Sequence, residues 1–126
     1  MKVILTTLLV AMTVASAHAE LPSAAAAAVT QALASGRPTV IDLGARNCPS
    51  CKQMAPVLEE LSATYRDRAN VLFIDVRADA AAVGRFAIQM IPTQIFFDGR
   101  GLEVSRHIGA MDRSDLVKGL QAAGLK

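Results

Sequence analysis

The order of strand-like and helix-like segments is the strongest constraint on how this chain of 126 residues can fold. Apolar segments predict four strands, at residues 39–43, 70–76, 93–97 and 102–108. Helical spacing and helix-ending residues predict four helices, at about 22–34, 48–65, 79–86 and from 112 or 114 to about 124. A helix between the first two strands favours a parallel pair, and a tight turn between the last two makes them antiparallel. The pattern therefore predicts an α/β domain with a central mixed four-stranded sheet flanked by helices.

Composition agrees with one folded domain. The hydrophobic content of 52% is high enough for a packed core. The net charge is only +2 and no basic block occurs in the sequence, so nucleic-acid binding has little support.

The first nineteen residues have the features of a secretory signal peptide. Lys2 provides a positive start, residues 3–14 are mostly apolar, and Ala17-His18-Ala19 has the small-x-small form of a cleavage site. An uncleaved membrane anchor is the alternative, although a spanning helix needs about 20 apolar residues. We expect residues 1–19 to be a signal peptide cleaved near Ala19. Residues 20–126 would then form the domain, in the periplasm or another extracytoplasmic space.

Cys48 and Cys51 lie where the first strand and its loop give way to a helix. Unpaired N–H groups and the helix dipole at a helix N-terminus favour a thiolate at Cys48, and Pro49 fits the first helical turn. A disulfide that closes so short a loop adds little stability, which favours redox chemistry over a structural role. Cys48 would attack a substrate disulfide and Cys51 would resolve the mixed disulfide.

A structural disulfide and half of a zinc site remain alternatives for this pair. A structural zinc site normally takes four protein ligands. The predicted mature chain offers only two cysteines and one distant histidine, His107. We therefore expect no metal and no other cofactor.

Four motifs together resemble the thioredoxin family over nearly all of the predicted mature chain. They are Val40-Ile41-Asp42, Cys48-Pro49-Ser50-Cys51-Lys52 followed by Met54-Ala55-Pro56, Ile91-Pro92-Thr93, and Gly109. Each motif alone is weak, and their joint occurrence in this order is specific. The resemblance implies a thioredoxin-like fold and protein thiol–disulfide exchange.

The resemblance also implies roles for residues outside the cysteine pair. Pro92 would follow a cis peptide bond, and the backbone of Ile91 would pair with an extended substrate segment. Gly109 would lie beside the active site. Asp42 would be buried beneath Cys51 and accept its proton, since burial raises a carboxyl pKa. An ordinary trans proline and a solvent-facing Asp42 are the alternatives.

Three positions depart from the family pattern. Asn47 stands where thioredoxins usually have Trp, Phe73 where many have a buried Lys, and Ser50 where Pro is usual. With these departures, the chain looks more like exported thioredoxin-like proteins that receive electrons from a membrane thiol transporter. The central dipeptide lacks the His of many oxidising relatives, which favours a reductase or isomerase.

We therefore expect a monomeric enzyme that acts on proteins with disulfides or thiols. A non-enzymatic binding module with the same fold is one alternative, and a dedicated thiol carrier for cytochrome or metal-site assembly is another. Arg46 could add positive potential near Cys48 or could simply be a solvated loop residue. Met54 and Met90 are expected to serve packing, and His107 is expected on a strand face.

Overall fold

The computed structural model describes residues 20–126; the predicted signal peptide, residues 1–19, lies outside the described residues. The elements are α1 (Ala26–Leu33), β1 (Thr39–Gly44), α2 (Pro49–Thr64), β2 (Asn70–Asp75), α3 (Ala81–Arg85), β3 (Thr93–Phe97), β4 (Glu103–Ile108) and α4 (Arg113–Ala122). The predicted order of four helices and four strands is confirmed. Within residues 20–126, no helix is both long and apolar enough to cross a membrane.

The four strands form one mixed sheet in the order β2-β1-β3-β4. β1 runs parallel to β2 and antiparallel to β3, and β3 and β4 form an antiparallel hairpin. The predicted sheet is therefore confirmed, with its parallel pair joined through α2.

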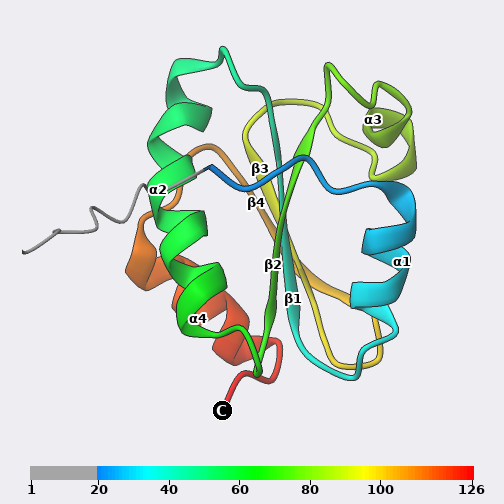
Figure 1. Ribbon diagram of the computed structural model, residues 1–126, viewed down its shortest axis with the longest axis vertical. Coiled ribbons are helices and arrows are strands. Elements are labelled where there is room, and N and C mark those ends of the chain that lie inside the picture. The colour runs from blue at the N-terminus through cyan, green and yellow to red at the C-terminus, as the bar shows by residue number, and fades with distance from the viewer. Residues whose placement is uncertain (1–19) are drawn as a thin grey trace, which may run out of the picture.

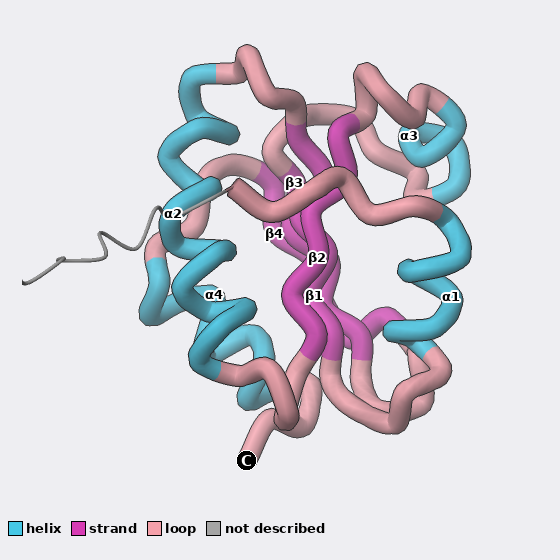
Figure 2. The backbone as a smooth tube through the Cα atoms, viewed as in Figure 1, coloured by secondary structure: helices cyan, strands magenta, loops and turns pink. Residues whose placement is uncertain are grey.

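Helices cover both faces of this sheet. In the edge-on view, α2 and α4 lie on one side, and α1 and α3 lie on the other (Figures 1 and 2). Side chains alternate between the two faces along a strand. Val40 of β1 joins the core under α2 and α4, whereas Ile41 and Leu43 join the core against α1. By the same alternation, Asp42 and Gly44 face α2.

The predicted apolar face of α2 is confirmed. Met54, Leu58 and Leu61 are almost fully buried, and Val57 packs partly buried against the same cluster. Burial of such side chains contributes about 1.5–3 kcal/mol each, so this face fixes α2 on the sheet. α2 in turn holds the cysteine pair at its N-terminus.

The prediction that the first helix begins at Pro22 is wrong. Helix α1 begins at Ala26, because the chain before it runs beside β2 instead. Ser23 forms a parallel bridge with Phe73, and the Ala24 N–H donates to the Phe73 carbonyl oxygen at 2.7 Å. The segment thus crosses the β2 edge of the sheet between the two helix layers (Figure 1).

Candidate redox site

Cys48 and Cys51 form a disulfide at the N-terminus of α2, with their Cα atoms 5.1 Å apart. Cys48 is the N-cap residue and Pro49 is the first helical residue, as predicted. The Cys51 N–H donates to Cys48 Sγ at 3.3 Å, and the Ser50 hydroxyl lies 3.4 Å from the same sulfur. Donors aimed at Cys48 Sγ favour its thiolate over its thiol once the disulfide is reduced.

The two sulfurs differ in their access to solvent. Cys48 is half-buried, whereas Cys51 is only 5% exposed. Cys48 is therefore the more accessible of the two cysteines to a protein disulfide, and Cys51 is largely shielded from one. This asymmetry matches an attacking and a resolving thiol.

Gly44 provides the space for Cys51. A Cβ atom at Gly44 would lie 3.1 Å from Cys51 Sγ, which is tighter than ordinary contact, and 3.4 Å from the ring of Phe73. Gly44 was not among the predicted site residues. The signal that could have done so is a glycine at the end of an otherwise apolar strand, since strand glycines often mark close approach.

Asp42 is fully buried on the same face of β1 as Gly44. The solvent-facing alternative for Asp42 is therefore wrong. Burial raises the pKa of Asp42 from 3.8 to about 6, and a hydrogen bond from Gln94 partly opposes that rise. A carboxyl with a pKa near neutral can both take up and release a proton under physiological conditions.

The register places Phe73 and Gln94 on the two sides of Asp42. Asp42 pairs with Phe73 of β2 in parallel register and with Gln94 of β3 in antiparallel register. Phe73 thus occupies the place expected for a charged partner and offers only an apolar ring. Gln94 was missed by the sequence analysis, although a glutamine inside the buried strand 93–97 is itself an unusual feature.

The predicted proline loop lies at the same end of the sheet as the cysteines. The Ile91–Pro92 peptide bond is cis, as expected, so the trans alternative is wrong. Thr93 pairs with both Leu43 and Ile108, which brings the start of β3 to the end of β1 and of β4. The Gly109 N–H donates to the Pro92 carbonyl oxygen at 2.8 Å.

Gly109 and Ile91 complete this end of the sheet. Gly109 has a φ of 104°, which favours glycine and lets the chain turn away after β4. The backbone of Ile91 makes no hydrogen bond to any other described residue in the range 20–126. Its N–H and carbonyl groups can therefore pair with another chain.

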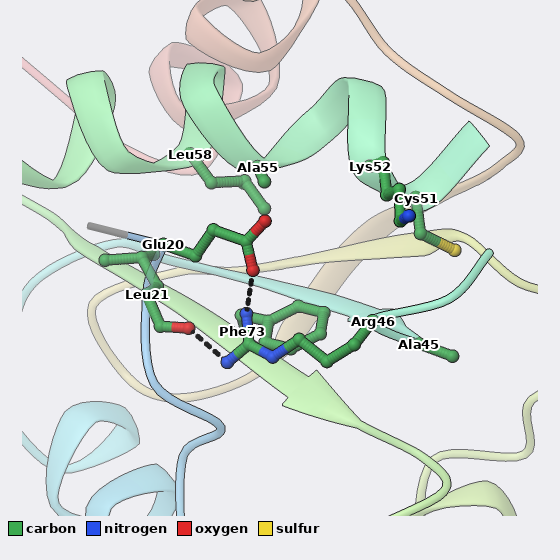
Figure 3. Close-up of a pocket in the computed structure, with 9 residues that line it drawn as sticks. All are labelled: Glu20, Leu21, Ala45, Arg46, Cys51, Lys52, Ala55, Leu58 and Phe73. Carbon is green, nitrogen blue, oxygen red and sulfur yellow. Dashed lines mark hydrogen bonds and ion pairs between the residues drawn. The ribbon is translucent and has the colours of Figure 1, made fainter. Parts of the chain in front are cut away.

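Arg46 is exposed in the loop after β1, and its side chain contacts three other residues. Its guanidinium lies 4.5 Å from the centre of the Phe73 ring. It donates to Glu20 Oε2 at 2.9 Å and to the Leu21 carbonyl oxygen at 2.6 Å (Figure 3). Arg46 is thus an exposed loop residue whose charge is paired with Glu20, and its effect on the potential at Cys48 stays a prediction.

A small pocket lies between this cluster and the redox centre. Figure 3 shows the side chains around it, which include Glu20, Leu21, Arg46, Cys51, Lys52 and Phe73. The pocket borders the buried cysteine rather than the accessible one. The pocket therefore lies next to Cys51, the buried half of the disulfide.

Met54 and His107 lie where they were predicted, in the core and on a strand, whereas Met90 does not serve the packing expected of it. Met54 is buried, and its Sδ accepts from the Met111 N–H at 3.1 Å. Met90 is 64% exposed on the rim before the proline loop. His107 lies exposed on β4.

No group of three or more His, Cys, Asp or Glu side chains within the described part of the chain is placed to hold a metal ion. Both cysteines are joined in the disulfide. The arrangement supports exchange of this disulfide with thiols of another molecule.

Comparison with known proteins agrees with this chemistry. A sequence model of the thioredoxin family matches residues 21–122. A thioredoxin from Mycolicibacterium smegmatis is 40% identical over 96 residues, which cover 75% of this chain and 85% of that protein. A thioredoxin from Acidithiobacillus ferridurans is 33% identical over 88 residues, covering 70% and 81%. The protein disulfide-isomerase erp38 of Neurospora crassa is 36% identical over 87 residues, covering 67% of this chain and 24% of that protein.

Proposed function

Because the chain belongs to the thioredoxin family, we propose that it is an exported protein-disulfide reductase or isomerase that receives electrons from a membrane thiol transporter. The chain is a thiol–disulfide oxidoreductase with the thioredoxin fold, and Cys48–Cys51 is its redox disulfide. The cellular location, the net direction, the electron source and the roles of the individual residues are the proposed part.

The exposure difference between Cys48 and Cys51 is the observation on which the assignment of roles depends. The half-buried Cys48 is the thiol that attacks the substrate disulfide, at the end of α2 that favours its thiolate. The buried Cys51 then attacks Cys48 within the mixed disulfide. Substrate leaves as a dithiol, and the two electrons that it gained came from the cysteine pair.

The proline loop is the proposed docking site for substrate. The unpaired backbone of Ile91 hydrogen-bonds an extended segment of the substrate next to its disulfide. Pro92 and Gly109 are joined by a hydrogen bond and shape the surface on which that segment lies. Asp42 accepts the proton of Cys51 when Cys51 becomes the nucleophile, which suits a carboxyl with a pKa of about 6.

Location and direction have support from the sequence. The positive start, apolar run and Ala17-His18-Ala19 of the predicted signal peptide support export. The Pro49-Ser50 dipeptide contains no His, which supports a reducing potential. A reductase outside the cytoplasm needs an electron supply, and a membrane thiol transporter would provide it.

Trapping of mixed disulfides tests the proposed roles. Cys51→Ser should accumulate mixed disulfides through Cys48 with a model disulfide protein, because the resolving thiol is missing. Cys48→Ser is the matched control and should form none. Trapping that requires Cys51 while Cys48 is dispensable would reverse the assignment.

Redox titration against glutathione tests the direction. We expect a reduction potential nearer to about −270 mV, the value typical of thioredoxin, than to about −120 mV, the value of a strong oxidant. A value near the oxidising end would make the protein an oxidase.

Mass spectrometry of the exported fraction should find a mature chain that starts at or near Glu20, and a retained Met1 would contradict cleavage.

A further inference from the structure

Asp42 belongs to a row of four side chains that crosses the sheet under α2. Phe73 pairs with Asp42, Asp42 pairs with Gln94, and Gln94 pairs with His107. Residues directly opposite each other on neighbouring strands share one face of the sheet, with Cβ atoms about 4.5–5.5 Å apart in antiparallel pairs. Gln94 is therefore the polar neighbour of Asp42 within the sheet.

The contact between Gln94 and Asp42 is direct and shielded from water. Gln94 Nε2 donates to Asp42 Oδ1 at 2.8 Å, and both residues are 0% exposed. Asp42 Oδ2 and Gln94 Oε1 are also buried, and neither has a hydrogen-bond partner among residues 20–126. One amide donor thus holds one carboxylate oxygen, while the amide oxygen is left over.

Gln94 Oε1 can accept a hydrogen bond once Asp42 takes up a proton. A protonated carboxyl carries an O–H donor, and a glutamine amide carries both an N–H donor and a carbonyl acceptor. A half-turn of the Gln94 amide brings its oxygen to the place of its nitrogen. The same side chain can then accept a hydrogen bond from protonated Asp42, so each protonation state of the carboxyl has a matching amide orientation.

No charged group from the neighbouring elements replaces Gln94 as the partner of Asp42 within the described residues. β2 presents the Phe73 ring, and α4 presents the apolar Leu116 and Leu120 to the same core. From α2, the titratable Cys51 lies against Gly44, which is two residues along β1 from Asp42 on the same face, and Lys52 is exposed. The charge of Arg46 is paired with Glu20, and His107 lies exposed on the far side of Gln94.

We propose that Gln94 is a positioning residue that holds Asp42 ready to exchange a proton with Cys51, its amide donating to the carboxylate and, after a half-turn, accepting from the protonated acid. This inference depends on the proposed role of Asp42. In the resolving step the Cys51 S–H proton passes to the Asp42 carboxylate. The Cys51 thiolate then attacks Cys48, the Cys48–Cys51 bond forms, and the bond from Cys48 to the substrate sulfur breaks, so that the substrate leaves as a thiolate.

The proposal has a definite consequence for pH dependence. The hydrogen bond from Gln94 lowers the pKa of Asp42 against the larger effect of burial. Gln94→Met keeps the length of the side chain and removes the amide, so Asp42 should remain protonated to higher pH. The variant also loses the bond from the protonated acid, but a hydrogen bond to a charged group is the stronger of the two. The resolving step should then need a higher pH to reach half of its maximum rate, by up to about one pH unit.

Single-turnover kinetics with a model disulfide protein, from about pH 5 to about pH 9, can test this shift. We expect Gln94→Met to move the profile of the resolving step to higher pH and to leave the attack by Cys48 unchanged. The carbon-13 signal of the Asp42 carboxyl in the oxidised protein should titrate at a correspondingly higher pH. A packing role alone would move neither midpoint. If Gln94→Met does not fold, Gln94→Leu serves as the second variant.

Two further variants separate the possible failures. His107→Gln, one strand further along the row, should leave the profile unchanged. The same shift in His107→Gln would overturn the proposal, because the histidine and not the amide would then set the pH dependence. If Asp42→Asn slows the resolving step but Gln94→Met leaves the profile unshifted, the role of Gln94 is refuted while that of Asp42 stands. If neither variant changes the resolving step, the proposed role of Asp42 is itself wrong.

Discussion

Burial of the Asp42 carboxyl should destabilise the folded protein at neutral and alkaline pH. Asp42 is 0% exposed, and burial raises its pKa from 3.8 to about 6. A rise of about two units costs about 3 kcal/mol, at about 1.4 kcal/mol per unit. Asp42→Asn keeps the shape of the side chain and removes the charge, so the variant should be more stable than the original protein by up to that amount at about pH 8.

The sign and the pH window follow from the two pKa values. Below pH 3.8 the carboxyl is protonated in both the folded and the unfolded chain, so its titration makes no difference there. As the pH rises towards 6, the unfolded chain releases this proton first, and the folded state loses stability relative to the unfolded state. Above about pH 6 the full difference is present.

Denaturant unfolding of the oxidised proteins at about pH 8 and about pH 4 measures this effect. The stability advantage of Asp42→Asn should be large at the higher pH and mostly gone at the lower one. The pH-dependent part is diagnostic, because a change in packing would be present at both. Asp67→Asn, in the exposed turn after α2, is the matched control for loss of a carboxylate at the surface. An advantage of the same size at both pH values would refute the reasoning.

Three further changes test the packing around the site. A Cβ atom at Gly119 would overlap the buried ring of Phe96, so Gly119→Ala should cost about 1–3 kcal/mol of unfolding free energy despite the better helix propensity of alanine, and a stabilised variant would contradict the close contact. Gly44→Ala should crowd Cys51 Sγ more in the disulfide than in the thiol, which can rotate away. Titration against glutathione should therefore find a less negative reduction potential, by on the order of 20 mV for each kcal/mol of crowding, and an unchanged or more negative potential would count against this. Leu61→Ala should lower the unfolding free energy by about 2–5 kcal/mol in denaturant unfolding, and a loss below 1 kcal/mol would show that the site collapses around the cavity.

The strand and helix order could be predicted because local patterns determine it. The apolar residues of β1 and β3 stand out against their flanks, and the redox disulfide lies at the predicted strand-to-helix junction. The cis bond before Pro92 was expected only from a family resemblance, since local patterns do not determine it. Features that have a local sequence pattern or a family motif could therefore be predicted from the sequence.

The error at the start of α1 and the missed contacts of Arg46 and Gln94 involve distant segments of the chain. The alanine-rich start of α1 has high helix propensity, but pairing of Ser23 with Phe73 across the sheet edge takes precedence. The partners of Arg46 lie 25 and 26 residues before it in the chain, and nothing in the local pattern identifies them. Gln94 became a candidate only when the strand register placed it beside Asp42. Such pairings depend on tertiary packing, which propensity and periodicity do not contain.

The sheet also separates the protein into two halves that can change independently. All the chemistry lies on the α2 side, in the cysteine pair and the row through Asp42, whereas Val29, Ile41 and Ile95 fill a separate core against α1. Residues without shared contacts have nearly additive effects on stability. Natural selection can therefore remodel the α1 side, for a new partner or a new temperature, without retuning the redox couple. We expect variation among descendants of this protein to accumulate there first.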